Sequence, residues 1–140
     1  MRYLGSWTNL NDALYLTRTQ VYAPGAGVRE GSHRTTVILT DGVDNIPYEG
    51  SPHTLHNATL CKNDQIRLLA VGVTDGVDED RLMQIISSPN DYYHVEDFDA
   101  LDRLVKDITP DLCYTGPPGK TSQFVSVAYS FFAALPALQR

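Results

Sequence analysis

The stretch Thr35-Thr36-Val37-Ile38-Leu39-Thr40-Asp41-Gly42 decides the fold. Residues 35–40 form a β-branched, apolar run in which apolar and polar side chains do not alternate. A strand that is buried on both faces of a sheet has this pattern. Asp41 follows at once, so we expect its carboxylate at the carboxyl end of a buried strand. Gly42 permits a tight turn there.

Helical and extended patterns alternate along the rest of the chain. The sequence predicts strands at 35–40, 66–73 and 92–95, and helices at 9–22, 51–62, 78–87 and 98–108. Asn9 or Asn11 is the expected cap of the first helix, and Asp97 that of the last. Strict alternation with short connections predicts an α/β fold, in which a doubly wound parallel sheet has helices on both faces. Because ligands of such sheets bind where the strands end, the functional edge should hold Asp41 and Asp75.

The composition fits one globular domain. The chain has 140 residues, of which 42% are hydrophobic and 20% charged, and its net charge is −6. It has no basic run, so binding of nucleic acid through phosphate contacts is not expected. All acidic residues lie between Asp12 and Asp111. We therefore expect the domain to end near Cys113, followed by a Pro/Gly linker and an apolar tail at 114–140.

Some features of the sequence resemble a membrane span, a nucleotide-binding loop or a metal site, but they lack the length, spacing or further ligands that these need. The tail, Phe124 to Leu138, is interrupted by Pro136 and is shorter than the roughly 20 residues that cross a bilayer. Residues 116–122 resemble a phosphate-binding loop, but too few residues separate the glycines, so no nucleotide is expected. The same residues form two Gly-X-Y triplets, which Ser122 ends, and a flexible linker or the start of a collagenous region fits them. His53 and His56 are expected to be surface residues.

Two motifs together resemble the von Willebrand factor A domain of collagens, matrilins and other matrix proteins. The first is Gly5-Ser6-Trp7-Thr8-Asn9, just before a helix, and the second is Thr40-Asp41-Gly42. The match continues through the strands at 66–73 and 92–95 and the last helix, so it covers about residues 3 to 113. The resemblance implies a Rossmann-like sheet, a secreted protein, matrix or cell-surface protein partners, and no enzymatic activity. An enzyme using Asp41 would need a positioned base or nucleophile, which the sequence does not indicate.

The resemblance also implies a divalent-cation site, usually for Mg²⁺, which prefers oxygen ligands. Thr8 and Asp41 match two of its three loops. The remaining loop, the family's first, is Asp-x-Ser-x-Ser, and it does not occur in this sequence. We therefore expect a partial domain that lacks the family's first strands, has about three strands and four helices, and does not support metal-dependent binding by itself. A structural segment for matrix assembly, without metal-dependent binding, is the alternative.

The sequence also contains candidate sites of covalent modification. Cys61 and Cys113 can pair with each other or with cysteines elsewhere. The resemblance implies that Cys113 pairs with a cysteine in the missing region, which leaves Cys61 free or buried. Asn57-Ala58-Thr59 is an N-glycosylation acceptor in a secreted chain. Residues 1–6 have no apolar segment, so they are not a signal peptide, and the extracellular location rests on the resemblance.

Overall fold

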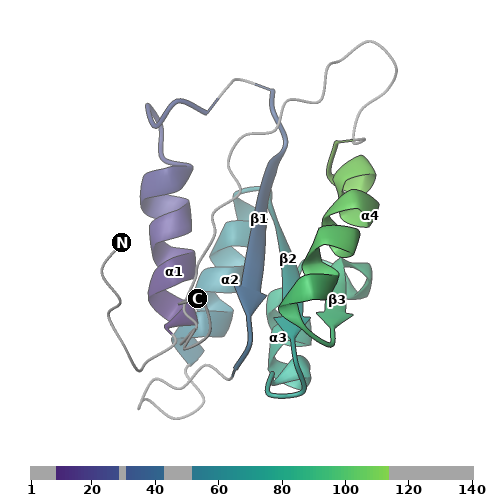
Figure 1. Ribbon diagram of the computed structural model, residues 1–140. Coiled ribbons are helices and arrows are strands. Elements are labelled where there is room, and N and C mark those ends of the chain that lie inside the picture. Colours follow the sequence, from purple (N-terminus) through teal and green to yellow (C-terminus); the bar gives the residue numbers. More distant parts are fainter. Residues whose placement is uncertain (1–8, 29–30, 43–51, 114–140) are drawn as a thin grey trace, which may run out of the picture.

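The computed structural model of the chain describes residues 9–28, 31–42 and 52–113. Within these residues, three strands alternate with four α-helices (Figure 1). The strands are β1 (Arg34–Thr40), β2 (Ile66–Val73) and β3 (Tyr92–Val95), and the helices are α1 (Leu10–Leu16), α2 (Pro52–Asn63), α3 (Glu79–Ile85) and α4 (Leu101–Cys113). The described ranges also contain one short π-helical segment, η1 (Thr17–Val21), and two 3₁₀-helical turns, η2 (Pro89–Asp91) and η3 (Phe98–Ala100).

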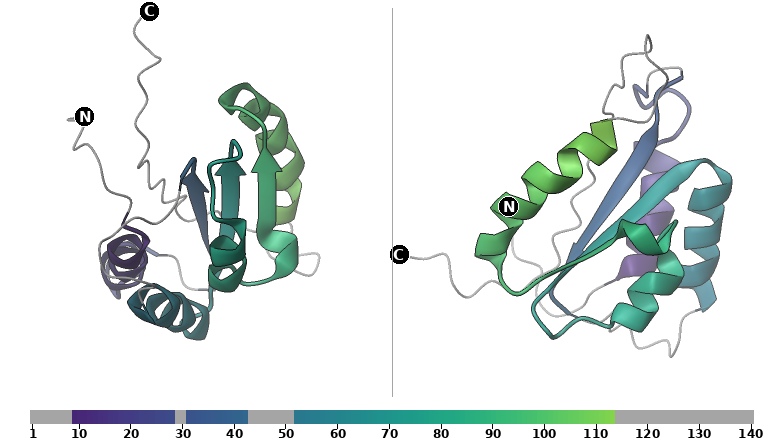
Figure 2. Two further views of the ribbon diagram at one scale, coloured as in Figure 1. Left: turned by 90° about the horizontal axis from the view of Figure 1, so that it is seen from below. Right: turned by 90° about the vertical axis from the view of Figure 1, so that its right-hand side faces the viewer.

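The three strands form one parallel sheet with the order β1-β2-β3. Arg34 of β1 is paired with Ile66, and the register continues to the pair Thr40 and Gly72. Helices α1, α2 and α3 lie on one side of the sheet and α4 lies on the other, as the left view of Figure 2 shows. The expected doubly wound α/β architecture is thus confirmed, and β1 forms one edge of the sheet in the described part of the chain.

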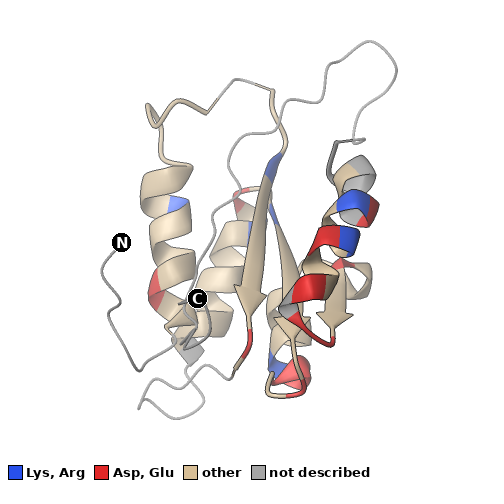
Figure 3. Cartoon of the chain, viewed as in Figure 1, with Lys and Arg blue, Asp and Glu red and all other residues tan. Residues whose placement is uncertain are grey.

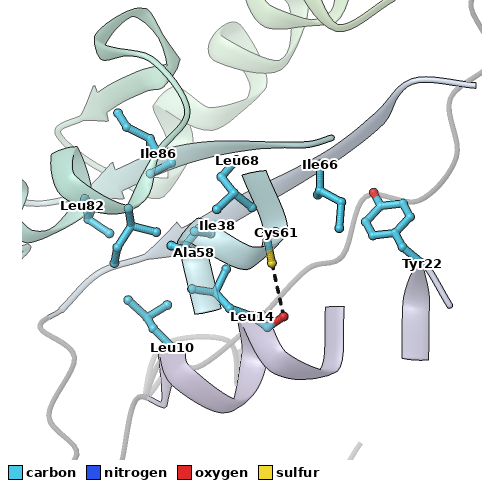
Figure 4. Packing of buried hydrophobic residues seen from close by; sticks show 12 residues of the cluster. Leu10, Leu14, Tyr22, Ile38, Ala58, Cys61, Ile66, Leu68, Leu82 and Ile86 are labelled. Atoms are coloured by element: carbon cyan, nitrogen blue, oxygen red, sulfur yellow. Dashed lines mark hydrogen bonds between the residues drawn. The ribbon is translucent and has the colours of Figure 1, made fainter. Parts of the chain in front are cut away.

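Two layers of apolar side chains hold the helices to the sheet. The larger layer lies between the sheet and helices α1, α2 and α3 (Figure 4). It contains Leu10, Leu14, Tyr22, Ile38, Ala58, Cys61, Ile66, Leu68, Ala70, Leu82, Ile85 and Ile86. The smaller layer lies under α4 and contains Val37, Leu69, Val71, Val73 and Val95. Neighbouring strand residues belong to different layers because successive side chains of a strand point to opposite faces.

Side-chain caps explain where three helical segments begin, and two of these caps, Asn9 and Asp97, were expected from the sequence. Asn9 caps α1, because its Oδ1 accepts a hydrogen bond from the Asp12 N–H at 2.8 Å. Asp78 Oδ1 accepts from the Arg81 N–H at 2.9 Å, and Asp97 Oδ1 accepts from the Ala100 N–H at 2.8 Å. Asp97 therefore caps η3, the short turn that leads into α4.

The helix ends differ from the prediction. The predicted helix at 9–22 keeps α-helical geometry only to Leu16 and then widens into the π-helical turn η1. Helix α3 ends at Ile85 because the chain then turns back to β2, where the Ser87 N–H donates to the Leu68 carbonyl at 2.9 Å. Helix α4 continues to Cys113, beyond the predicted end at 108. No helix in the described ranges is both long and apolar enough to cross a membrane.

Candidate functional site

The carboxyl ends of β1 and β2 bring two loops together. Asp41 and Gly42 follow β1, and Thr74, Asp75 and Gly76 follow β2. The two backbones are so close that a Cβ atom at position 76 would lie 3.0 Å from the Asp41 carbonyl oxygen. A glycine at position 76 therefore lets the loops meet. Asp41 is half-buried, so part of this residue is open to solvent.

The described residues do not complete a cation site at this edge. Thr8, the other expected metal ligand, lies outside the described residues. Within the described ranges, no three His, Cys, Asp or Glu side chains are grouped so that they could hold a metal ion. A divalent cation needs about six oxygen ligands, some of which are waters. The Asp41 carboxylate alone does not fit that requirement.

The loop after β2 contains an unusual backbone conformation. Thr74 has a φ of 66°, which is rare for a β-branched residue. The surrounding contacts hold it there: its N–H donates to the Val95 carbonyl at 2.9 Å, and its Oγ1 accepts from the Gly76 N–H at 3.4 Å. Backbone strain of this kind persists only where the surrounding structure maintains it. Residues with such strain cluster at functional sites.

A histidine that the sequence analysis did not identify contacts this loop. His94 Nε2 lies 3.7 Å from the Asp75 Oδ1, and His94 Nδ1 lies 3.4 Å from the Tyr92 hydroxyl oxygen. Desolvation, with a smaller contribution from Glu79, raises the pKa of Tyr92 above its usual value. His94 comes near the loop through the register of β2 with β3, in which Gly72 is paired with His94, and residues close to His94 in the sequence do not determine that register.

Acidic side chains concentrate at the same end of the molecule. Figure 3 shows them in red around the ends of the strand arrows. Those that follow a strand or begin the next helix are Asp41, Asp75, Asp78, Glu79, Asp80, Glu96 and Asp97. Such an edge attracts cations and positively charged groups and repels anionic ligands.

The candidate modification sites lie on α2 and at the end of α4. Cys61 is a free, fully buried thiol, and its Sγ donates to the Leu14 carbonyl at 3.5 Å. Burial raises the pKa of this thiol to about 11. Cys113 is the last residue of α4, and its side chain lies outside the described part of the structure. Asn57 is half-buried, whereas His53 and His56 are exposed on the same helix.

Comparisons with known proteins identify relatives of this fold and sequence. A family model described as the von Willebrand factor type A domain matches residues 1–107. The collagen alpha-1(XII) chain of Notophthalmus viridescens is 31% identical over 121 residues, which are 84% of this chain and 12% of the relative. Matrilin-1 of Homo sapiens is 25% identical over a match that covers 100% of this chain and 27% of the relative. The chain thus spans only a small part of the length of these relatives.

Solved structures of a matrix protein also match this chain in fold. The proximal thread matrix protein 1 of the mussel byssus matches with a TM-score of 0.61 and 27% identity, over 74% of this chain and 24% of that protein. A second structure of that protein, with a zinc-occupied MIDAS motif, matches with a TM-score of 0.60 and 28% identity, over 72% of this chain and 23% of that protein. The metal-ion-dependent adhesion site of that mussel protein therefore accepts a divalent metal.

Proposed function

Because the chain belongs to the von Willebrand factor type A family, we propose that it is an extracellular module that binds matrix or cell-surface proteins. The match of the family model over residues 1–107 carries this proposal. The relatives include collagen XII, matrilin-1 and collagen VI chains, which are secreted proteins of the extracellular matrix. Type A domains of matrix proteins are interaction modules, and we propose the same non-enzymatic role here.

We further propose that this chain does not bind its partner through a metal ion by itself. The sequence has no Asp-x-Ser-x-Ser motif. Asp41 is the one family-matched metal ligand in the described ranges, where no three His, Cys, Asp or Glu side chains are grouped so that they could hold a metal ion. Thr8 and Asp41 would become Mg²⁺ ligands only where an Asp-x-Ser-x-Ser loop from elsewhere completes the site. Residues 1–113 would then be the part of the domain that presents the acidic edge.

The alternative function is a structural segment for matrix assembly. The name of the mussel relative, a thread matrix protein, favours this possibility. A structural role requires a stable sheet and exposed surface, but it does not require a cation. The two functions therefore differ in whether the chain recognises a separate protein ligand.

Thermal unfolding with and without Mg²⁺ tests the metal part of the proposal. A cation that binds only the native state at 100 times its dissociation constant would stabilise it by about 2.7 kcal/mol. We expect no such gain in the wild type or in Asp41→Ala. A gain that is present in the wild type and absent in Asp41→Ala would contradict the proposal, and Asp80→Ala is the control for lost negative charge.

Binding to immobilised fibrillar collagen, in Mg²⁺ and in EDTA, tests the interaction part. Equal binding under both conditions supports a metal-independent interaction module. Binding that EDTA abolishes contradicts the absence of a metal site. An absence of binding to collagen and to a cell-surface extract favours the structural alternative.

A further inference from the structure

One atom of Asn57 has two possible uses. The side-chain nitrogen Nδ2 is the atom that receives the sugar in an Asn-x-Thr acceptor, and Asn57-Ala58-Thr59 is such a triplet. In the folded chain, the same Nδ2 donates a hydrogen bond to Asn11 Oδ1 at 2.8 Å. Asn57 lies on α2 and Asn11 on α1, so this bond joins the two helices.

The bond to Asn57 ends a chain of polar contacts that begins at the cap of α1. Asn9 Nδ2 donates to Asp12 Oδ2 at 2.6 Å, and Asn11 Nδ2 donates to Asp12 Oδ1 at 3.3 Å. Through Asn11, this network connects the first turn of α1 to Asn57 on α2. The start of α1, whose cap Asn9 directly follows Thr8 in the sequence, is thus tied to α2.

The surroundings of Asn57 leave little room for a sugar on its nitrogen. Asn57 is half-buried, and its neighbours Thr54, Ala58 and Cys61 on the same helix are buried. Helix α1 packs on this side of α2, as the contact between Cys61 and Leu14 shows. A glycan at this position needs space that the first turns of α1 occupy.

We propose that glycan attachment at Asn57 and docking of the start of α1 onto α2 exclude each other. In the transfer, Nδ2 forms a bond to the anomeric carbon of a lipid-linked oligosaccharyl diphosphate. The bond from that carbon to the diphosphate oxygen breaks, the lipid diphosphate leaves with the electron pair of that bond, and Nδ2 releases one of its two protons to the solvent. One N–H remains on Nδ2, but the sugar takes the space beside it that Asn11 occupies, so the glycosylated chain keeps α2, loses the Asn57–Asn11 hydrogen bond (the clasp) and opens α1 more often. This inference rests on the secreted location in the proposed function.

Three matched chains, secreted from mammalian cells behind a supplied signal peptide, test this proposal. Thr59→Ala removes the acceptor triplet and keeps the Asn57–Asn11 hydrogen bond. The change should disturb little else, because the Thr59 hydroxyl donates to the Leu55 carbonyl within its own helix in the described structure. Asn11→Ala removes the clasp and keeps the triplet. The third chain is the wild type. Intact mass gives the occupancy of Asn57, and hydrogen exchange followed by mass spectrometry gives the opening of residues 10–16.

We expect glycosylated wild type and Asn11→Ala to exchange the amides of α1 roughly five-fold faster than Thr59→Ala, the effect of one lost neutral hydrogen bond. A glycan found on Asn11→Ala but absent from the wild type also supports exclusion. The proposal is overturned if glycosylated wild type and Thr59→Ala exchange α1 at the same rate, or if no chain carries a glycan. Because the signal peptide is supplied, failure of the collagen or Mg²⁺ experiments leaves this result interpretable.

Discussion

The guanidinium of Arg67 and the carboxylate of Asp91 form an ion pair where β2 and β3 begin. Arg67 Nε donates to Asp91 Oδ1 at 2.9 Å, and Arg67 Nη2 contacts the same oxygen. The Asp91 side chain is 3% exposed and that of Arg67 is 33% exposed. The carboxylate is therefore almost removed from water, and the arginine compensates its charge where the chain enters β3.

Replacing Asp91 by alanine should lower the free energy of unfolding by about 2 kcal/mol. Breaking a fully buried pair costs about 3–5 kcal/mol, and we expect less here because water still reaches part of Arg67. Urea denaturation measures the change. Asp64→Ala is the control, since the Asp64 side chain is 48% exposed in its pair with Arg18 and should cost less than about 0.5 kcal/mol. Equal losses in the two variants would contradict the role of burial.

Replacing Thr74 by glycine should stabilise the protein by about 1 kcal/mol. Thr74 has a positive φ, which costs a β-branched residue of order 1–3 kcal/mol and costs glycine almost nothing. The variant loses the weak hydrogen bond from the Gly76 N–H, which offsets part of the gain. Thermal unfolding and urea denaturation measure the difference. A destabilised Thr74→Gly variant would show that contacts of the threonine side chain outweigh the strain.

The opposite change at Gly72 should destabilise the sheet. A Cβ atom at this position would lie 2.8 Å from the Tyr92 hydroxyl oxygen and 2.9 Å from Val77 Cγ2. Gly72→Ala should therefore cost about 1–3 kcal/mol, as overpacking of a core does. Adding Tyr92→Phe should recover part of the loss, because it removes one of the two clashing atoms. Urea denaturation of the two single variants and the double variant measures these changes in unfolding free energy. If the double variant recovers no stability, the clash with the Tyr92 hydroxyl is not the cause of the loss.

The buried thiol of Cys61 should make stability fall at alkaline pH. Its pKa is about 11 in the folded chain, compared with an ordinary value of 9.0. Above pH 9 the unfolded chain therefore loses the thiol proton before the folded chain does. The resulting loss of unfolding free energy has a slope of up to about 1.4 kcal/mol per pH unit and continues to about pH 11.

Cys61→Ala is the matched variant for this prediction. It removes the thiol but keeps Tyr22, whose pKa burial also raises. We expect Cys61→Ala to be less stable at pH 7, because it leaves a small cavity, and to lose less stability between pH 9 and pH 11. Parallel stability curves for the two proteins over that range would contradict the assignment to Cys61.

Local sequence signals predicted most of the fold. The predicted strands at 66–73 and 92–95 match β2 and β3, and the strand predicted at 35–40 begins one residue earlier in the structure. Most residues of β1 and β2 are buried on the sheet, where β-branched and apolar composition is a reliable signal. The helix caps Asn9 and Asp97 were also predictable, because a side-chain oxygen close to a helix start acts over a few residues.

Contacts between distant segments account for what the sequence did not reveal. The approach of His94 to Asp75 depends on the register of β2 with β3. The clasp between Asn11 and Asn57 depends on how α1 packs on α2. Likewise, the end of α3 at Ile85 is set by hydrogen bonds of Ser87 with β2 and has no signal within the helix itself. At the candidate metal site, the sequence placed Asp41 at the end of β1, and the contribution of Thr8 stays a prediction.

The parallel pairing of β1 with β2 also affects the rate at which the chain folds. Arg34 must reach Ile66, about thirty positions further along the chain, before β1 can pair with β2. The intervening segment contains α2, so the sheet cannot grow from a hairpin and has to wait for a crossover to close. Such topologies have high contact order and fold more slowly than helical bundles of the same size. Until the crossovers close, the apolar faces of the strands stay exposed, and such transient exposure favours association with other chains.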